Sequence, residues 1–277
     1  MDKCEIQRKI TEFTHADVKK DGSLVRVMSS NVLNSNDPSS KSFKISYAER
    51  AKILCEYYLA FEPDFIGLQE VSGAMTKEFC ENLTEKYSFA AVTPDGHHNF
   101  TPVLYLKDKY DLLFSEHVNF MENKDGCWSY QVALYSTKSA PQNKIIHINL
   151  HYHFLSTDTR LPNAKLVNKE IKELREKYPD VPIFVSGDYN CSVSSPEYKA
   201  MIEGTGMNSA MLLTDSHYGF KSWYHNIGEL DEAKDQDEID HICVIEERVK
   251  VVRHRKIRDM LIRDASDHCP IFIDATI

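Results

Sequence analysis

PIFVSGDYN, residues 182–190, is an apolar run of strand composition that stops at a glycine and then presents two polar side chains, Asp188 and Asn190. Their spacing directs both to the same side of an extended chain, so a buried strand here would place two functional side chains at its end. A carboxylate and a carboxamide held together can orient a water molecule or hold a divalent cation. The alternative is a plain turn, because Gly, Asp and Asn are the commonest turn formers.

The residues before this stretch predict a strand and a helix. Residues 144–151 alternate between apolar and polar side chains and end at His151, and residues 160–178 carry an apolar stripe closed by Pro179. A strand, a helix and the strand at 182–187 make a β-helix-β unit, as in a sheet packed under helices. His151 and His153 form a pair that can bind a metal, although one functional histidine beside a solvated neighbour is the commoner arrangement.

Other strand-like runs also end in polar side chains. Residues 24–31 end in Asn31, and residues 64–71 carry Glu70 near their far end. An ionised carboxylate in a dry core is costly, so Glu70 should be paired, metal-bound or at an open edge; alternatively it caps a helix that starts near Ala74. The same pattern continues downstream, with Asp240 in a strand over 238–245, and Asp267 and His268 at the start of a last strand over 266–273.

The remaining pattern completes a mixed α/β chain. The spacing predicts helices over 47–61, 74–87 and 196–203, and strands over 103–106, 112–120 and 131–136. The basic run 250–258 favours an exposed edge strand protected by charge over a phosphate-binding ridge. The aromatic segment 217–225, with Trp223 and His225, is expected to shape a substrate pocket, the alternative being a packed surface loop.

Composition indicates one large globular domain. The 277 residues are 42% hydrophobic and 27% charged, which predicts a single domain over 1–277 with an N-terminal extension at 1–22. The net charge of -9 argues against a protein dedicated to nucleic acid. Seven scattered cysteines without a C-x-x-C pair predict reduced thiols. A charged start and no long apolar run predict a cytoplasmic protein without a membrane span, and no protein partner is evident.

The polar strand ends form blocks that follow one another in a fixed order. They are SSN at 29–31, GLQE at 67–70, NLH at 149–151, SGDYN at 186–190, EIDHI at 238–242 and SDHCP at 266–270. In this order they resemble the endonuclease/exonuclease/phosphatase family, which has the deoxyribonuclease-I-like fold. The resemblance implies an α/β four-layered sandwich, with two central, mainly antiparallel β-sheets flanked by helices. It also implies hydrolysis of a phosphoester by an activated water and a divalent cation, usually Mg²⁺, with Mn²⁺ as the alternative.

The resemblance also implies a role for each matching residue. Glu70 would be the principal metal ligand, with Asn31 beside it and Asp267 nearby. Asp188 and Asn190 would position the attacking water and contact the scissile phosphate. His268 would pair with Asp240, and His151 would donate to a phosphate oxygen. Either Asp188 or the Asp240–His268 pair could serve as the general base, so both remain open.

The chain departs from the family pattern in a few places. Leu33 stands where many members have a further acid, which favours one metal over two without deciding between them. His153 also replaces an acid of some relatives, so it is assigned no role. The stretch FTPVLYLKDKYDLL, residues 100–113, resembles bacterial members described only as metal-dependent hydrolases, and here Asn99 and Tyr105 are expected to line the pocket.

These observations predict a Mg²⁺-dependent phosphodiesterase or phosphatase that acts on a small or lipid-derived phosphoester. A nuclease acting on DNA or RNA is the alternative within the class. The alternative from another class is a catalytically inactive member that serves as a binding module. Metal-dependent turnover distinguishes the enzyme from the binding module.

Overall fold

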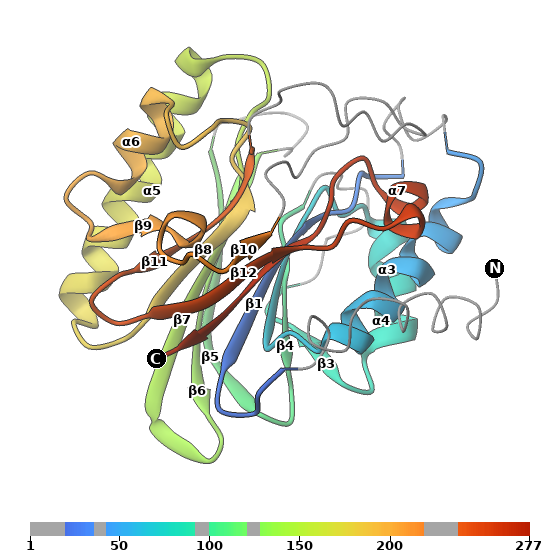
Figure 1. Cartoon of the computed structure of the whole chain (residues 1–277), viewed down its shortest axis with the longest axis horizontal. Coiled ribbons are helices and arrows are strands. Elements are labelled where there is room, and N and C mark those ends of the chain that lie inside the picture. Colours follow the sequence, from blue (N-terminus) through green and yellow to red (C-terminus); the bar gives the residue numbers. More distant parts are fainter. Residues whose placement is uncertain (1–19, 36–42, 92–99, 121–127, 219–237) are drawn as a thin grey trace.

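The computed structural model describes residues 20–35, 43–91, 100–120, 128–218 and 238–277, and these form two β-sheets packed face to face. Helices cover the outer faces: α3, α4 and α7 lie on one side of the pair of sheets and α5 and α6 on the other (Figure 1). The order of layers is therefore helix, sheet, sheet, helix. The predicted four-layered α/β sandwich is confirmed.

Within the described residues the first sheet has seven strands and the second has six. Most neighbours are antiparallel, whereas β1–β2, β7–β8 and β10–β12 are parallel. The first sheet runs in the order β10 (His217–Tyr218), β12 (Lys250–Lys256), β13 (Ile271–Thr276), β1 (Val25–Asn31), β2 (Phe65–Gln69), β4 (Val103–Leu106) and β3 (Tyr87–Phe89). The second runs in the order β5 (Tyr110–Asn119), β6 (Ser129–Thr137), β7 (Ala140–His151), β8 (Ile183–Asp188), β11 (Asp240–Ile245) and β9 (Met207–Ser209).

The helices begin at polar caps that the sequence supplies. Ser46 and Glu49 form a capping box at the start of α3, and Ser72 accepts from the Met75 amide at the start of α4. Ser72, not Glu70, is thus the residue that caps the helix. The helices are α3 (Tyr47–Phe61), α4 (Gly73–Leu83), α5 (Thr157–Lys177), α6 (Pro196–Ile202), α7 (Met260–Ala265) and the short 3-10 helix η2 (Ala210–Leu212). No helix in these described stretches is long and apolar enough to cross a membrane.

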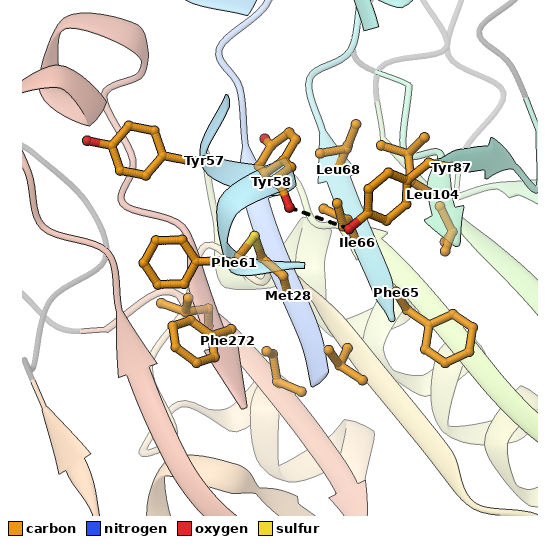
Figure 2. Packing of buried hydrophobic residues seen from close by; sticks show 14 of the residues in the cluster. Met28, Tyr57, Tyr58, Phe61, Phe65, Ile66, Leu68, Tyr87, Leu104 and Phe272 are labelled. Atoms are coloured by element: carbon orange, nitrogen blue, oxygen red, sulfur yellow. Dashed lines mark hydrogen bonds between the residues drawn. The ribbon is translucent and has the colours of Figure 1, made fainter. Parts of the chain in front are cut away.

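The larger core lies between α3 and the first sheet and continues between the sheets. Figure 2 shows Tyr58 and Phe61 of α3 over Met28 of β1, with Phe272 of β13 beside Phe61. The Tyr87 hydroxyl donates to the Tyr58 carbonyl, which gives this buried polar group a partner (Figure 2). Each fully buried aromatic ring of this kind contributes roughly 1.5–3 kcal/mol, so this face fixes β1 and β2 under α3.

A buried polar layer joins the two sheets just beneath the strand ends. Gln69 Nε2 donates to Asn149 Oδ1 at 2.6 Å, and Asn149 Nδ2 donates to the Leu68 carbonyl at 2.6 Å. Gly67 allows this close approach, because a Cβ there would lie 2.3 Å from both Asn149 Oδ1 and Ser186 Oγ. The bonds fix β2 against β7 and thereby set where the residues after them stand.

Some predicted elements have different bounds. The helix expected over 74–87 ends at Leu83, and Tyr87 instead begins β3, because its backbone pairs with Leu106. The last strand begins at Ile271, which leaves Asp267 and His268 in the loop before it. The short elements β3, β9, β10 and α7 were not predicted, since they are too brief to show a period.

The basic run 250–258 is not an exposed edge strand. β12 lies between β10 and β13, and its His254 and Lys256 are buried. The charge pattern was misleading because Lys256 is neutralised inside the protein by Glu238. The five cysteines that the structure describes, Cys55, Cys80, Cys191, Cys243 and Cys269, form no disulfide with one another.

Candidate active site

The functional side chains meet where strands of both sheets end. Asn31 of β1 pairs with Gln69 of β2, directly before Glu70. In the other sheet, Asp188 of β8 pairs with His151 on one side and with Asp240 on the other. Because β1 and β2 pack on β8, the two groups face each other across the sheets. The predicted site residues on these strands are therefore brought together.

Asn31 connects a carboxylate from each sheet. Its Nδ2 donates to Glu70 Oε1 and to Asp188 Oδ2, both at 3.0 Å, and its Oδ1 accepts from the Leu33 amide. The Asn34 amide donates to the second oxygen of Glu70 at 3.3 Å. Glu70 has a φ of 61°, in the left-handed region where such a side chain is strained by roughly 1–3 kcal/mol. The hydrogen bonds hold this backbone in place and direct the carboxylate into the site.

His268 and Asp240 form a buried pair beside Asp188. His268 Nδ1 and Asp240 Oδ2 are 2.8 Å apart, while His268 Nε2 lies 3.7 Å from Asp188 Oδ2. Burial alone would lower the pKa of His268, but the Asp240 and Asp188 carboxylates outweigh it and raise this pKa well above its ordinary value. The Ser266 hydroxyl accepts from the His268 amide and donates to the Asn31 carbonyl. The loop that carries the histidine is thus fastened to β1.

Asp188 lies at the centre of the cluster. His151 Nε2 is 3.6 Å from Asp188 Oδ2 and 4.0 Å from Glu70 Oε1. Burial, followed by the charge of Asp240, raises the pKa of Asp188 to about 6. Burial also lowers the pKa of His151, so this ring is neutral near pH 7. The site therefore combines a poised carboxylate with a neutral and a readily protonated histidine.

The donor set fits a hard divalent cation. Glu70, His151 and Asp188 each offer a ligand atom within 4.8 Å of the others, as do Asp188, Asp240 and His268. Only Glu70 among these is partly exposed, and Asp240 already accepts from His268, so the first group is the better candidate for a metal. The carboxylate oxygens of this group suit Mg²⁺ or Mn²⁺, whereas an imidazole is a ligand more typical of softer metals.

Some predicted ligands have a different setting. The Asn31 nitrogen, not its oxygen, faces the two carboxylates, so in this structure Asn31 orients them. Asp267 is partly exposed and lies outside both groups, although its charge and that of Glu70 both act on Arg50. Asn190 has a φ of 49° and its Nδ2 donates to the Tyr152 carbonyl at 2.8 Å, while its amide donates to Asp188 Oδ1.

The structure does not bring Tyr105 to the site. It pairs with Phe65, four positions before Gln69 on β2, and its ring packs on Tyr135 with centroids 5.0 Å apart. The Tyr105 ring therefore contributes to the packing between the two sheets. The other predicted pocket residues, Asn99, Trp223 and His225, lie outside the described residues.

Arg50 supports the site and was not predicted. It is buried in α3, and its guanidinium donates to the carbonyls of Val32, Leu33 and Ala265. These bonds hold the chain after β1 against the end of α7. A signal was present in the sequence, because Arg50 lies four residues before Leu54 on the apolar face of the helix, where a charge needs a specific partner.

A second buried ion pair lies beside Asp240 and gives a testable prediction. Lys256 Nζ and Glu238 Oε2 are 2.8 Å apart, with both side chains almost fully buried, and the charge of Asp240 also acts on Lys256. Lys256→Met is expected to lower the free energy of unfolding by about 3–5 kcal/mol, because a buried carboxylate loses its counter-charge. Urea unfolding measures the loss.

Two further variants serve as comparisons. Lys256→Met combined with Glu238→Gln should recover part of the stability, since the uncompensated charge is gone. Lys86→Met breaks the exposed pair with Glu62 and should change stability by less than about 1 kcal/mol. An equal loss in Lys256→Met and Lys86→Met would contradict this account.

The two-sheet sandwich with carboxylates and histidines at one edge defines a class of protein that sequence comparison also finds. The model of the Endonuclease/Exonuclease/phosphatase family matches residues 28–268, and the chain belongs to this family. Carbon catabolite repressor protein 4 homolog 3 of Arabidopsis thaliana is 26% identical over 163 residues, which cover 56% of this chain and 35% of that protein. The chain thus matches about a third of the length of that relative.

Solved structures share the fold. An endonuclease/exonuclease/phosphatase from Bacteroides vulgatus matches with a TM-score of 0.78 and 22% identity, covering 91% of this chain and 98% of that one. The mannosyl-6-phosphatase Bt3783 of Bacteroides thetaiotaomicron matches at 0.75 and 20%, covering 91% and 100%. TDP2 of D. rerio, complexed with a single-strand DNA product, matches at 0.71 and 18%, covering 92% and 100%.

Proposed function

We propose that the protein hydrolyses phosphoesters with the help of a bound divalent cation, Mg²⁺ in the first place. The convergence of Glu70, His151 and Asp188 with the His268–Asp240 pair carries this proposal. A phosphoester is anionic and repels an attacking hydroxide, so a catalyst must offset charge on its oxygens and also position a base. The cluster holds groups for both tasks within a few ångströms.

Each side chain has a role that its surroundings support. Glu70 would hold the cation, with Asn31 orienting its carboxylate and that of Asp188. The bound cation would supply positive charge for the phosphoryl oxygens and lower the pKa of a bound water. His268, kept protonated by Asp240, would donate to a phosphate oxygen, which leaves Asp188 as the candidate base with a pKa near the working pH.

The range of substrates that we expect for this protein is narrower than the range that the whole family acts on. The family neighbours named above are a phosphatase of a phosphorylated sugar and a protein bound to single-strand DNA, so both monoesters and diesters are candidates. The net charge of -9 disfavours a long polyanion, because non-specific phosphate binding needs clustered cations. A small phosphoester is therefore preferred, with a nuclease as the alternative.

Release of p-nitrophenol from bis(p-nitrophenyl) phosphate tests the proposal. Turnover is expected with added Mg²⁺, loss with a chelator, and recovery when Mg²⁺ or Mn²⁺ is restored. A panel of p-nitrophenyl phosphate, short oligonucleotides and phospholipids then separates monoesterase, nuclease and lipid activity. Cation binding by calorimetry without turnover of any of these esters would support the binding module instead.

A further inference from the structure

Three aromatic rings pack against one another shortly after the end of β7. The Trp128 and His153 ring centroids are 3.8 Å apart with their planes tilted by 33°, whereas those of His153 and Phe154 are 5.2 Å apart and stacked, with an interplanar angle of 15°. Phe154 is 61% exposed, so one face of its ring is open to solvent. We call Trp128, His153 and Phe154 the ring stack.

The ring stack is fastened to the site. His153 and Phe154 stand two and three residues after His151 in the chain. The Tyr152 amide donates to the Asp188 carbonyl at 2.9 Å, and the Tyr152 carbonyl accepts from Asn190 Nδ2 at 2.8 Å. Two steps along the chain separate the Cα atoms of His151 and His153 by no more than about 7 Å. A group bound on the rings would therefore be attached close to the reacting phosphate.

The backbone under the rings is held before any ligand arrives. Arg160 Nη1 donates to the carbonyls of His153 and Phe154 at 3.2 and 3.1 Å, and its Nε donates to the buried Glu197 at 2.6 Å. The Leu155 amide donates to His153 Nδ1 at 2.9 Å. Such preorganisation reduces the entropy lost on binding.

Resting on the proposed function, we propose that the ring stack is a subsite for a nucleobase, which stacks on Phe154 while its phosphoester occupies the cluster around Asp188. The near-parallel rings of His153 and Phe154, of which Phe154 is exposed, offer a flat face, and every base has a matching π-face. The chain is acidic overall, which disfavours binding of a long row of phosphates. A mononucleotide ester or a short single strand fits these conditions better than a duplex.

Two synthetic esters isolate the base. The p-nitrophenyl ester of thymidine 5′-phosphate and that of 1,2-dideoxyribose 5′-phosphate share the leaving group and the sugar phosphate and differ in the base alone. The thymidine ester is expected to have the higher kcat/KM. Phe154→Ala should lower that value on the order of 10- to 100-fold and leave the abasic ester unchanged, while Phe154→Trp should restore it.

A matched control is Phe114→Ala. Phe114 on β5 is 48% exposed, but its strand neighbour Leu134 pairs with Ile146, five residues before His151 and thus roughly 17 Å from the site. This variant should leave both esters unaffected. Since Phe154 and Phe114 are both exposed, circular dichroism should show a native fold in each.

The outcomes separate the two proposals. If wild type hydrolyses both esters equally and Phe154→Ala changes neither, the subsite is wrong and the proposed function stands. If neither ester is hydrolysed, the proposed function is in doubt, and calorimetry with thymidine 5′-phosphate against abasic phosphate decides on the subsite alone. Binding to phosphatidylcholine vesicles that Phe154→Ala and Leu155→Ala abolish, without any base dependence, would overturn the subsite in favour of a lipid surface.

Discussion

His268→Ala is expected to lower kcat/KM for bis(p-nitrophenyl) phosphate by about 100- to 10,000-fold, the range typical of a lost acid–base group. The ring lies between Asp240 and Asp188, and in the proposed function it donates to a phosphate oxygen. Because the change leaves the buried Asp240 carboxylate without its partner, some loss of stability is expected, so turnover is compared per folded molecule. Steady-state kinetics of the purified variant, with circular dichroism, measures both.

A neighbouring histidine provides the comparison. His241 is also buried, follows Asp240 directly and contacts the Cys191 carbonyl rather than the cluster. His241→Ala should lower stability but retain most of the turnover per folded molecule. Asp240→Asn should resemble His268→Ala, and the double variant should be little worse than either, since the two residues act as a unit. Full activity of His268→Ala would mean that the site is misplaced.

Glu70→Gln is expected to reduce Mg²⁺-dependent turnover by on the order of 1,000-fold, because the cation's charge is worth several kcal/mol in the transition state. The same change should weaken Mn²⁺ binding measured by calorimetry in the absence of substrate. That second readout distinguishes a lost ligand from a lost base. The substitution keeps the size of the side chain, but its single amide oxygen can accept from either the Asn34 amide or Asn31 Nδ2 and not from both.

Glu62→Gln is a matched control for this variant. Glu62 has a φ of 49°, close to the 61° of Glu70, so both substitutions place glutamine in a left-handed backbone. Glu62 caps the end of α3 and pairs with Lys86 at the surface, away from the cluster. It should leave turnover and Mn²⁺ binding unchanged. Equal loss in both variants would point to backbone strain instead of a metal ligand.

Much of this architecture could be predicted from local pattern. Asn31, Glu70 and Asp188 end short apolar strands, and parallel or paired strand ends necessarily meet at one edge. The bounds of α3 follow from Ser46 and the apolar stripe. The family resemblance then supplied which of the polar ends belong together.

The rest depended on contacts between distant segments. Tyr105 looks like a pocket residue in sequence, but its position opposite Phe65 places the ring between the sheets. The sequence indicates a solvated charge at Lys256, because it does not show that Glu238, eighteen residues earlier, pairs with this lysine. The ring stack was not predicted either. Trp128 lies just before β6 and His153 just after β7, so no local sequence pattern shows that the two rings are in contact.

The position of β13 has a consequence for how the protein becomes active. This last strand lies in the middle of the first sheet, between β1 and β12, and Arg26 of β1 forms a buried ion pair with Asp274 across 248 residues of sequence. A chain still emerging from the ribosome holds Asn31 and Glu70 long before Ser266 and His268 exist. Contacts of such high sequence separation close late and slowly. Synthesis must therefore run through β13 before Asn31, Glu70 and His268 can be brought together.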